Sequence, residues 1–270
     1  DWANSTTYDM YDDNISSSNA ATSGATSLYQ STFFFRTADN RVYKVLDNNG
    51  GTAYSGAEPT SESTSPFALG GYVLKYMYTI TASEQTKYLT ADFIPVSTDS
   101  TVSAAATDGA IESLQITAGS GYTDGTYYAA VYGDGTSAGT SSGAIVSIVV
   151  TSGAIVSFGL TAGTDTSIHD GGTGYTFGTV NLASGYTFSD AALSSASAIG
   201  GSGGAVDVVI SPKEGHGNDA VAELGGHYVM MRTTLTGAEA DDVLTGNDFR
   251  NIALVIDPTT FGTSTVASET

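Results

Sequence analysis

The sequence predicts a mainly β protein with few short helices, in which a discontinuous β-sandwich-like domain surrounds an inserted, glycine-rich β repeat domain. Three observations lead to this prediction. Short runs of alternating apolar and polar residues recur, turn-forming residues separate them, and a block beginning Gly-Ala-Ile is repeated in the middle of the chain. We assign residues 1–103 and 211–258 to the main domain, residues 104–210 to the insertion and residues 259–270 to a C-terminal tail.

The composition limits the classes of partner. The chain has 28 acidic residues against 8 Lys and Arg, which gives a formal net charge of −20 over 270 residues. Because such a surface repels phosphate groups, we expect neither nucleic acid nor a membrane as a partner. The absence of cysteine excludes disulfides and thiolate metal sites. No apolar run is long enough to span a bilayer.

Residues 1–31 are polar and predict an extended arm. Three aromatic residues are its expected anchors: Trp2, Tyr8 and Tyr11. Asp9, Asp12 and Asp13 raise the alternative of a calcium site, but their spacing lacks the glycine and the final glutamate of an EF-hand loop. We therefore expect these carboxylates to lie on a solvated face.

A β-hairpin and a long loop follow the arm. Phe-Phe-Phe-Arg at 33–36 and Arg-Val-Tyr-Lys-Val-Leu at 41–46 flank the turn-forming residues 38–40. Residues 52–71 are rich in Ser, Thr, Gly, Pro and Glu, a composition typical of loops. Farther along, residues 83–89 predict a short helix, and residues 93–96 predict a strand that Pro95 confines to a sheet edge.

Residues 72–80 form the clearest predicted strand. Alternation places five of its apolar and aromatic residues on one face: Tyr72, Leu74, Tyr76, Tyr78 and Ile80. We expect this tyrosine-rich face to belong to the core or to an interface, because buried aromatic rings with a polar tip are common there. A sugar-binding platform is the alternative.

An internal repeat fills residues 104–210. The block at 109–119 returns in related form at 153–163, a half-copy begins at Gly143, and Gly-Tyr-Thr follows the two full copies at 121–123 and 174–176. We predict duplicated hairpins with Tyr122 and Tyr175 in equivalent places, and chain ends that lie close together where the insertion leaves the main domain. Eight residues should share its core: Ile111, Leu114, Ile116, Ile145, Ile148, Ile155, Phe158 and Leu160. Residues 170–174, Asp-Gly-Gly-Thr-Gly, suggest a calcium-binding β-roll as an alternative, although no nine-residue units follow in register.

Residues 211–231 combine two of the three histidines with turn and helix signals. Gly215 and Gly217 favour a turn, Asp219 is a suitable helix N-cap, Val221 and Leu224 should share one helical face, and Gly225 suits the helix end. A metal or general-base loop around His216 is one interpretation, because imidazole and carboxylate are usual ligands and proton carriers. We favour a structural role, in which His216 and Asp219 hold the turn by local hydrogen bonds.

The C-terminal part predicts two more strands. Residues 227–234 should follow the short helix as a strand, and residues 249–256 alternate on Ile252, Leu254 and Ile256. Arg250, surrounded by acidic residues, should form a structural salt bridge.

Four blocks, taken together and in this order, resemble a known family. They are RVYKVLDNNGG, EPTSESTSPFALGGYVLKYMYTI with YLTADFIPV, PKEGHGNDAVAELGGHYVMM, and NDFRNIALVIDP. They are similar to the baseplate wedge protein of T4-like contractile-tailed phages, the gene-product-eight family, in the version carried by marine cyanophages. The resemblance covers residues 1–100 and 211–258. It leaves out the repeat region, whose role cannot be carried over.

The resemblance implies a mostly β virion protein without catalysis, which forms a homodimer within a six-fold tail baseplate and is assembled in the host cytoplasm. Other baseplate wedge subunits are the implied partners. The family has a further segment ahead of the position of Asp1, so we expect an incomplete sheet edge near Trp2 or residues 33–35.

We therefore expect a structural subunit of a phage tail baseplate wedge, with no catalytic, cofactor-binding or metal-ligating residue and no cofactor. A glycan-binding or adhesin-like β module on a virion or cell surface is the alternative. A hydrolase would require a cleft that joins His216 or His227 to Asp and Ser partners.

Overall fold

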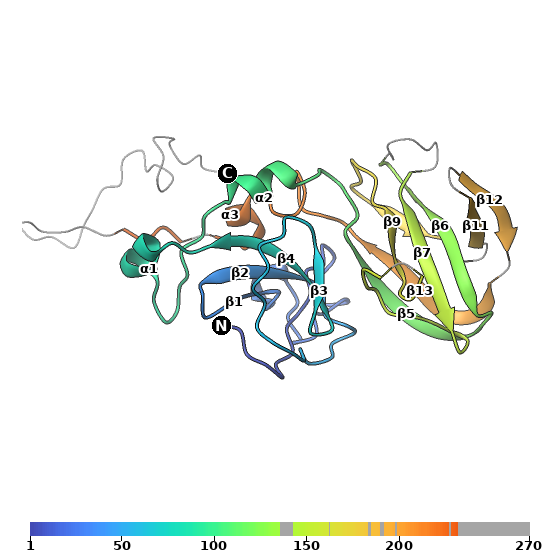
Figure 1. Ribbon diagram of the computed structural model, residues 1–270, viewed down its shortest axis with the longest axis horizontal. Coiled ribbons are helices and arrows are strands. Elements are labelled where there is room, and N and C mark those ends of the chain that lie inside the picture. The colour runs from blue at the N-terminus through green and yellow to red at the C-terminus, as the bar shows by residue number, and fades with distance from the viewer. Residues whose placement is uncertain are drawn as a thin grey trace, which may run out of the picture.

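The computed structural model describes residues 1–135, 143–161, 163–182, 185–189, 192–197, 199–226 and 228–231. It confirms a mainly β fold with few short helices, arranged as two lobes side by side (Figure 1). Predicted strand 249–256, Arg250, His227 and the tail 259–270 lie outside the described residues.

The first lobe is built on an antiparallel sheet in the order β1-β2-β4-β3. Its strands are β1 (Phe34–Arg36), β2 (Arg41–Asp47), β3 (Phe67–Leu69) and β4 (Tyr72–Thr79). The predicted hairpin is confirmed by the pairing of β1 with β2, and the predicted strand 72–80 is confirmed as β4. Strand β3 falls within the predicted loop 52–71, where the sequence has only three residues of apolar character before a Gly-Gly turn.

Short helices flank this sheet. They are η1 (Leu28–Gln30), α1 (Ala82–Tyr88), α2 (Ser100–Ala105) and α3 (Ala220–Glu223). Helix α1 confirms the predicted helix and begins with a capping box, in which Thr81 and Glu84 exchange side-chain and backbone hydrogen bonds. The predicted strand 93–96 is wrong: these residues form no ladder, and the carbonyl of Pro95 instead accepts a hydrogen bond from the Tyr78 hydroxyl.

A bulge in β4 divides the predicted tyrosine face. Tyr43 pairs with Tyr76 but Val42 pairs with Tyr78, so Met77 is the extra residue. Tyr76 packs in one core cluster, whereas Met77 and Tyr78 pack in another. The single face predicted for residues 72–80 is therefore wrong beyond Tyr76. The tyrosines of β4 are all buried, which opposes their use as a sugar-binding platform.

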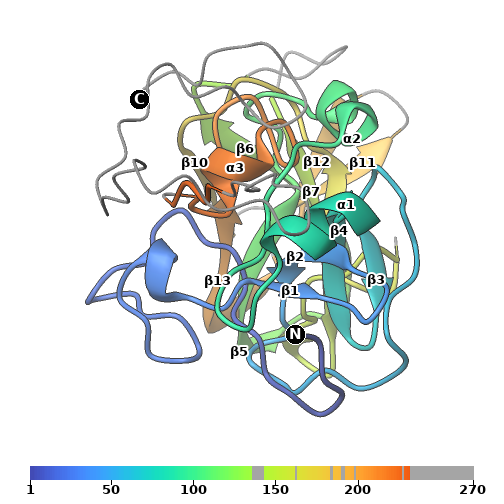
Figure 2. The same ribbon diagram turned by 90° about the vertical axis from the view of Figure 1, so that its left-hand side faces the viewer.

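The second lobe contains the repeat. A two-stranded ladder joins β5 (Ser113–Tyr122) to β13 (Gly200–Val209), which lie side by side in Figure 2. A larger sheet has the order β12-β11-β6-β7-β8, with β10 beside β6 and β9 beside β7. The strands of the larger sheet are β6 (Gly125–Gly133), β7 (Ile145–Thr151), β8 (Ala154–Ile155), β9 (Ser167–Asp170), β10 (Gly178–Val180), β11 (Gly185–Ser189) and β12 (Ala192–Ser197). Among the described residues of this lobe, every ladder between named strands is antiparallel, which is not the arrangement of a β-roll.

The two repeat copies have different backbone conformations, and each copy forms backbone hydrogen bonds with the other. The first copy enters the ten-residue strand β5, whereas the second forms only β8 before it turns away, so Tyr122 and Tyr175 are not in equivalent strands. The Tyr122 N–H donates to the Gly153 carbonyl and the Tyr175 N–H to the Gly109 carbonyl, each at 3.1 Å. Each copy's Gly-Tyr-Thr therefore binds the Gly-Ala-Ile of the other.

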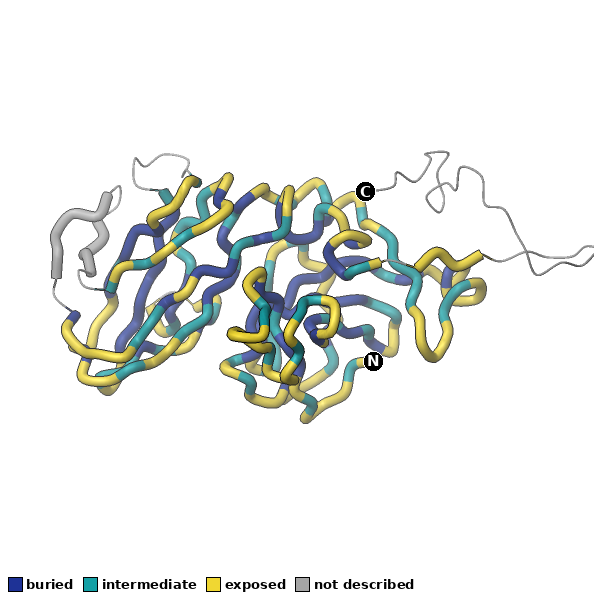
Figure 3. Tube along the Cα trace, turned by 180° about the vertical axis from the view of Figure 1, so that it is seen from behind, coloured by how far each residue is buried: buried dark blue, intermediate teal, exposed yellow. Residues whose placement is uncertain are grey.

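Most of the predicted repeat core is confirmed. Ile116 packs against one buried cluster that holds five of the expected residues: Ile111, Leu114, Ile148, Ile155 and Phe158. Figure 3 shows buried stretches of chain in both lobes. Ile145 is buried outside this cluster, and Leu160 is exposed. Leu46 and Val73 from the first lobe belong to the same cluster, so the two lobes share apolar contacts.

The chain crosses between the lobes at one place. Ser103 donates to Asn218, and the Glu214 N–H donates to Asp108, at 3.1 and 2.6 Å. The predicted proximity of the two ends of the insertion is confirmed. Independent folding of residues 104–210 stays a prediction.

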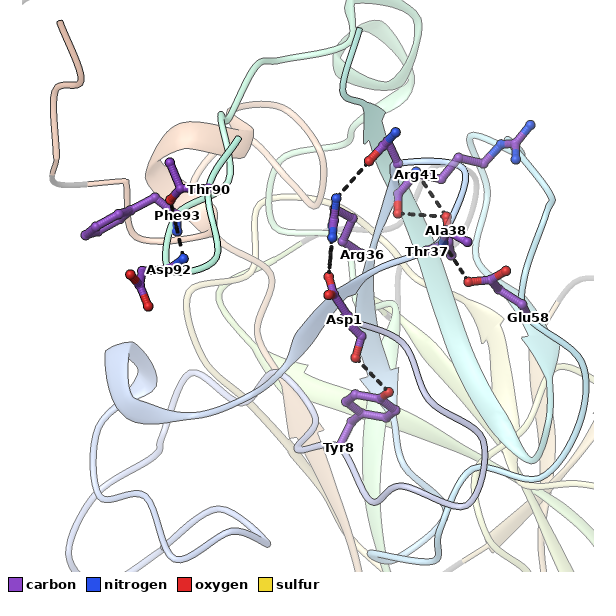
Figure 4. Close-up of polar contacts among 11 residues, drawn as sticks. Asp1, Tyr8, Arg36, Thr37, Ala38, Arg41, Glu58, Thr90, Asp92 and Phe93 are labelled. Atoms are coloured by element: carbon purple, nitrogen blue, oxygen red, sulfur yellow. Dashed lines mark hydrogen bonds and ion pairs between the residues drawn. The ribbon is translucent and has the colours of Figure 1, made fainter. Parts of the chain in front are cut away.

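The N-terminal arm packs against both lobes. Tyr8 and Tyr11 are buried, as predicted, and the Arg36 guanidinium of β1 pairs with Asp1 at 2.7 Å (Figure 4). Strand β1 lies at one edge of its sheet, where the Trp2 N–H donates to the Arg36 carbonyl. The incomplete edge expected near Trp2 or residues 33–35 stays a prediction.

The solvated face predicted for the arm's carboxylates is wrong for two of them. Asp9 is buried and accepts hydrogen bonds from the N–H and hydroxyl groups of Ser23 and Thr32. Asp12, also buried, accepts from Gln115 of β5 at 2.6 Å. These carboxylates organise the arm because loop backbone N–H groups otherwise lack acceptors.

Candidate functional site

Two lysines lie buried at the centre of the first sheet. Lys44 of β2 and Lys75 of β4 are direct cross-strand partners, with 0% and 1% of their surfaces exposed. A buried ammonium group is costly unless it is paired and hydrogen-bonded. The residues that surround it therefore form the most unusual chemical environment in the described chain.

Three side chains surround the Lys44 ammonium group, and we name these four residues the Lys44 centre. Lys44 Nζ lies 2.7 Å from Glu223 Oε2 and 2.8 Å from His216 Nδ1. The Tyr11 ring covers it, with its centroid 3.8 Å from Nζ, and packs edge to face against His216.

The segment 211–226 brings His216 and Glu223 to Lys44. Gly215 and Gly217 have φ of +96° and +91°, and a Cβ on Gly215 would meet the backbone of Thr107. Asp219 caps α3 by accepting from two backbone N–H groups, and Gly225, with φ +71°, follows the helix. These features confirm the predicted turn, cap and helix end.

Two expectations for this segment are wrong. Leu224 is buried but Val221 is exposed, because a helix of one turn gives the two residues different surroundings. The partner of His216 is Lys44, which is 172 residues away in the sequence, rather than a local group. The structural role of His216 stays a prediction.

Burial controls the protonation of the Lys44 centre. It lowers the pKa of Lys44 to about 8, although Glu223 opposes the shift. Burial and the charges of Lys44 and Lys75 hold the pKa of His216 well below its ordinary value. The imidazole is therefore neutral, and Nδ1 accepts from Lys44, which places the proton on Nε2. Nε2 is buried without a hydrogen-bond partner in the described chain.

This geometry does not suit the metal interpretation of His216. The nearest polar group is a cationic ammonium, which repels a metal ion. Within the described ranges, no group of three or more His, Asp or Glu side chains could hold a metal ion. The centre is instead suited to proton exchange between a lysine, a neutral imidazole and a carboxylate.

Sequence reasoning missed Lys44, Lys75 and Glu223. Lys44 stands between Tyr43 and Val45, and Lys75 between Leu74 and Tyr76. Two strands that pair each carry a lysine among apolar residues. This pattern could have indicated a buried cross-strand pair of lysines.

An exposed apolar surface follows α3 in the chain, where the Tyr228 ring packs against that of Phe93 with the centroids 5.3 Å apart. It consists of Phe93 with residues 228–231, and we name it the apolar surface. Phe93, Tyr228, Val229, Met230 and Met231 are 46%, 79%, 76%, 40% and 59% exposed. The N–H groups of Asp92 and Phe93 donate to Thr90, and Figure 4 shows the Phe93 ring pointing away from this turn. The predicted strand 227–234 is wrong for residues 228–231, which form no ladder.

Two hollows occur where the arm meets other segments. The first, of about 190 Å³, lies between the arm and residues 212–225, and the second, of about 270 Å³, lies between the arm and β5. His216 lines neither of them. Neither of these two hollows therefore provides the cleft at His216 that a hydrolase would require.

Comparisons with known proteins give no relative for this arrangement. No family model matches the chain, and neither curated proteins nor solved structures match it. In the part of the chain that the structure describes, no helix has the length and apolar character to cross a membrane.

Proposed function

We propose that this chain is a structural subunit of a phage tail baseplate wedge, which assembles through protein–protein contacts. The single observation that carries the proposal is the apolar surface, where three of the five residues are more than half exposed. Contiguous exposed apolar residues are typical of interaction surfaces. Aromatic residues and Met are enriched at such surfaces.

The resemblance of four sequence blocks to the baseplate wedge family supports the baseplate as the assembly to which this chain belongs. Two of those blocks contribute to the apolar surface, because Phe93 comes from one and residues 228–231 from another. The partners are other wedge subunits and a second copy of the chain.

Mass spectrometry of purified virions tests the proposal. We expect peptides from both lobes of this chain in gradient-purified particles, in constant ratio to the other tail proteins across the particle fractions. Peptides that occur only in the soluble fraction of the infected host, and not in the particles, would contradict it.

A glycan-binding module is a second candidate, which one observation favours. Tyr132 and Phe177 are 56% and 59% exposed. Tyr132 lies near the end of β6, and Phe177 immediately precedes the neighbouring strand β10 and donates its N–H to Asp134. Exposed aromatic rings next to a carboxylate can stack on sugar rings and accept from their hydroxyl groups. A glycan array with the whole chain, Tyr132→Ala and, as control, Tyr29→Ala separates this candidate from pure assembly.

A further inference from the structure

The Lys44 centre holds the groups needed to form a covalent bond between two of its own side chains. Lys44 and Glu223 have 0% and 3% of their side chains exposed, and Nζ contacts Oε2 at 2.7 Å. The other carboxylate oxygen, Oε1, accepts a hydrogen bond from the Gly217 N–H at 2.6 Å. His216 Nδ1 lies 2.8 Å from Nζ and 4.0 Å from Oε2.

Each of these contacts has a role in amide formation. An amine nucleophile needs an adjacent base, and His216 is a neutral imidazole in contact with it. The oxygen that becomes negatively charged during attack on a carboxyl carbon needs a fixed donor, and the Gly217 N–H occupies that position. We propose that Lys44 and Glu223 condense spontaneously into an intramolecular amide crosslink, with His216 as the base and Gly217 as the oxyanion donor.

The step balances without any other reactant. The Lys44 ammonium gives one proton to His216 Nδ1, and the free amine attacks Cδ of Glu223 to form the Nζ–Cδ bond. His216 then gives that proton to Oε2, and a second proton passes to Oε2 from the nitrogen of the intermediate. The Cδ–Oε2 bond breaks, one water molecule leaves, and Oε1 becomes the amide carbonyl oxygen.

The surroundings favour the neutral product over the ion pair. A buried ion pair carries a desolvation cost that often exceeds its Coulombic gain, whereas an amide carries no net charge. Because the fold already holds the two groups in contact, the reaction does not carry the entropy cost of bringing them together. The lowered pKa of Lys44 also makes the free amine accessible near neutral pH. Tyr11 shields the centre on the side of the arm.

The neighbouring pair provides an internal control. Lys75 Nζ lies 3.7 Å from Glu112 Oε1, and the Glu112 side chain is 26% exposed. His216 contacts Lys44 rather than Lys75, and no hydrogen bond to the Glu112 carboxylate comparable to that from the Gly217 N–H occurs in the described chain. We therefore expect Lys75 and Glu112 to remain uncoupled, although both pairs join a lysine of the same sheet to a glutamate.

Intact-mass measurement of the full wild-type chain is the direct test. Material that unfolds cooperatively should weigh less than the sequence mass by one water molecule. Protease digestion should give one branched peptide that joins the Lys44 and Glu223 segments, with Lys75 in a linear peptide. A full sequence mass in cooperatively folding protein, with Lys44 and Glu223 in separate peptides, would overturn the proposal.

Variants identify the groups that carry out the reaction. Glu223→Gln should lose ammonia rather than water when it couples, so the mass deficit reports which bond breaks. His216→Phe preserves a ring in the cavity and should slow coupling by at least tenfold, followed as the fraction of branched peptide over time after refolding. Lys75→Met serves as control and should leave the Lys44–Glu223 crosslink in place. If Lys75→Met abolishes the mass deficit while Lys44→Met retains it, the crosslink has been assigned to the wrong lysine.

Discussion

At the scale of single residues, burial determines the pKa of the Asp47 carboxyl group. Asp47 is 6% exposed at the end of β2, and burial raises its pKa to about 6 although the Asn49 N–H donates to its carboxylate. Between the ordinary pKa of aspartate and about pH 6, the folded state therefore holds a proton on Asp47 that the unfolded chain has released. Its contribution to stability is present below the ordinary pKa of aspartate and is lost as pH rises through about 6.

Asp47→Asn should remove this pH dependence and stabilise the protein at neutral pH, because an amide can still accept from the Asn49 N–H without a charge. A shift of this size corresponds to at most about 3 kcal/mol in the free energy of unfolding. Urea unfolding below and above about pH 6 measures it. Asp92→Asn, at an exposed position, is the control and should have little effect. An equal gain from both variants would show that net charge, rather than Asp47, is responsible.

At the scale of elements, the Gly-Tyr-Thr motifs at 121–123 and 174–176 each anchor a tyrosine hydroxyl to the backbone of the repeat lobe. The Ala144 N–H donates to the Tyr175 hydroxyl at 2.6 Å, and the Gly204 N–H donates to the Tyr122 hydroxyl at 2.9 Å. A Cβ on Gly135 would overlap the Tyr175 ring, and a Cβ on Gly143 would overlap its hydroxyl group. Glycine therefore provides the space that a buried tyrosine ring requires.

Tyr175→Phe should destabilise the protein by about 1 to 3 kcal/mol, because it leaves the buried Ala144 N–H without an acceptor. Tyr122→Phe, whose contact is only partly buried, should cost less. Chemical denaturation followed by tyrosine fluorescence gives both values. A loss for Tyr122→Phe as large as that for Tyr175→Phe would mean that burial does not determine the cost.

Local patterns predicted the elements whose cause is local. The hairpin at residues 38–40, helix α1 and the Asp219 cap follow from turn and capping residues close in sequence. The bulge at Met77 and the different backbones of the two repeat copies do not, because they depend on which strand pairs with which. Related sequences at 109–119 and 153–163 meet different partners, β13 and β7, and tertiary pairing overrides their shared pattern. Lys44 was missed for the same reason, since its acceptors come from residues 216 and 223.

At the scale of the whole molecule, the shared core determines how separable the lobes are. Residues 104–210 expressed alone should fold and melt cooperatively, since their strands pair among themselves. The melting temperature should be lower than that of the whole chain, because Leu46 and Val73 are absent from the core cluster. Calorimetry measures both properties. If the fragment shows no cooperative transition, residues 104–210 are not an independent domain.

The apolar surface should determine association. Tyr228→Asn combined with Met231→Gln should shift a homodimer to monomer at the same concentration, as measured by light scattering, because both side chains are more than half exposed. Tyr132→Asn, at a similarly exposed aromatic residue of the other lobe, should leave the dimer intact. A dimer unaffected by the first change would place the contact elsewhere.

The exchange between the repeat copies has a consequence for dividing the lobe into two halves. Strand β5 of the first copy pairs with β13 at the end of the second, and β7 at the end of the first pairs with β8 at the start of the second. Residues 143–148 and 204–209, Gly-Ala-Ile-Val-Ser-Ile and Gly-Ala-Val-Asp-Val-Val, occupy these closing strands. Each copy therefore supplies backbone partners to the other, so the two halves of the lobe complete each other's ladders. Neither half of the repeat lobe, expressed alone, should therefore form a complete sheet.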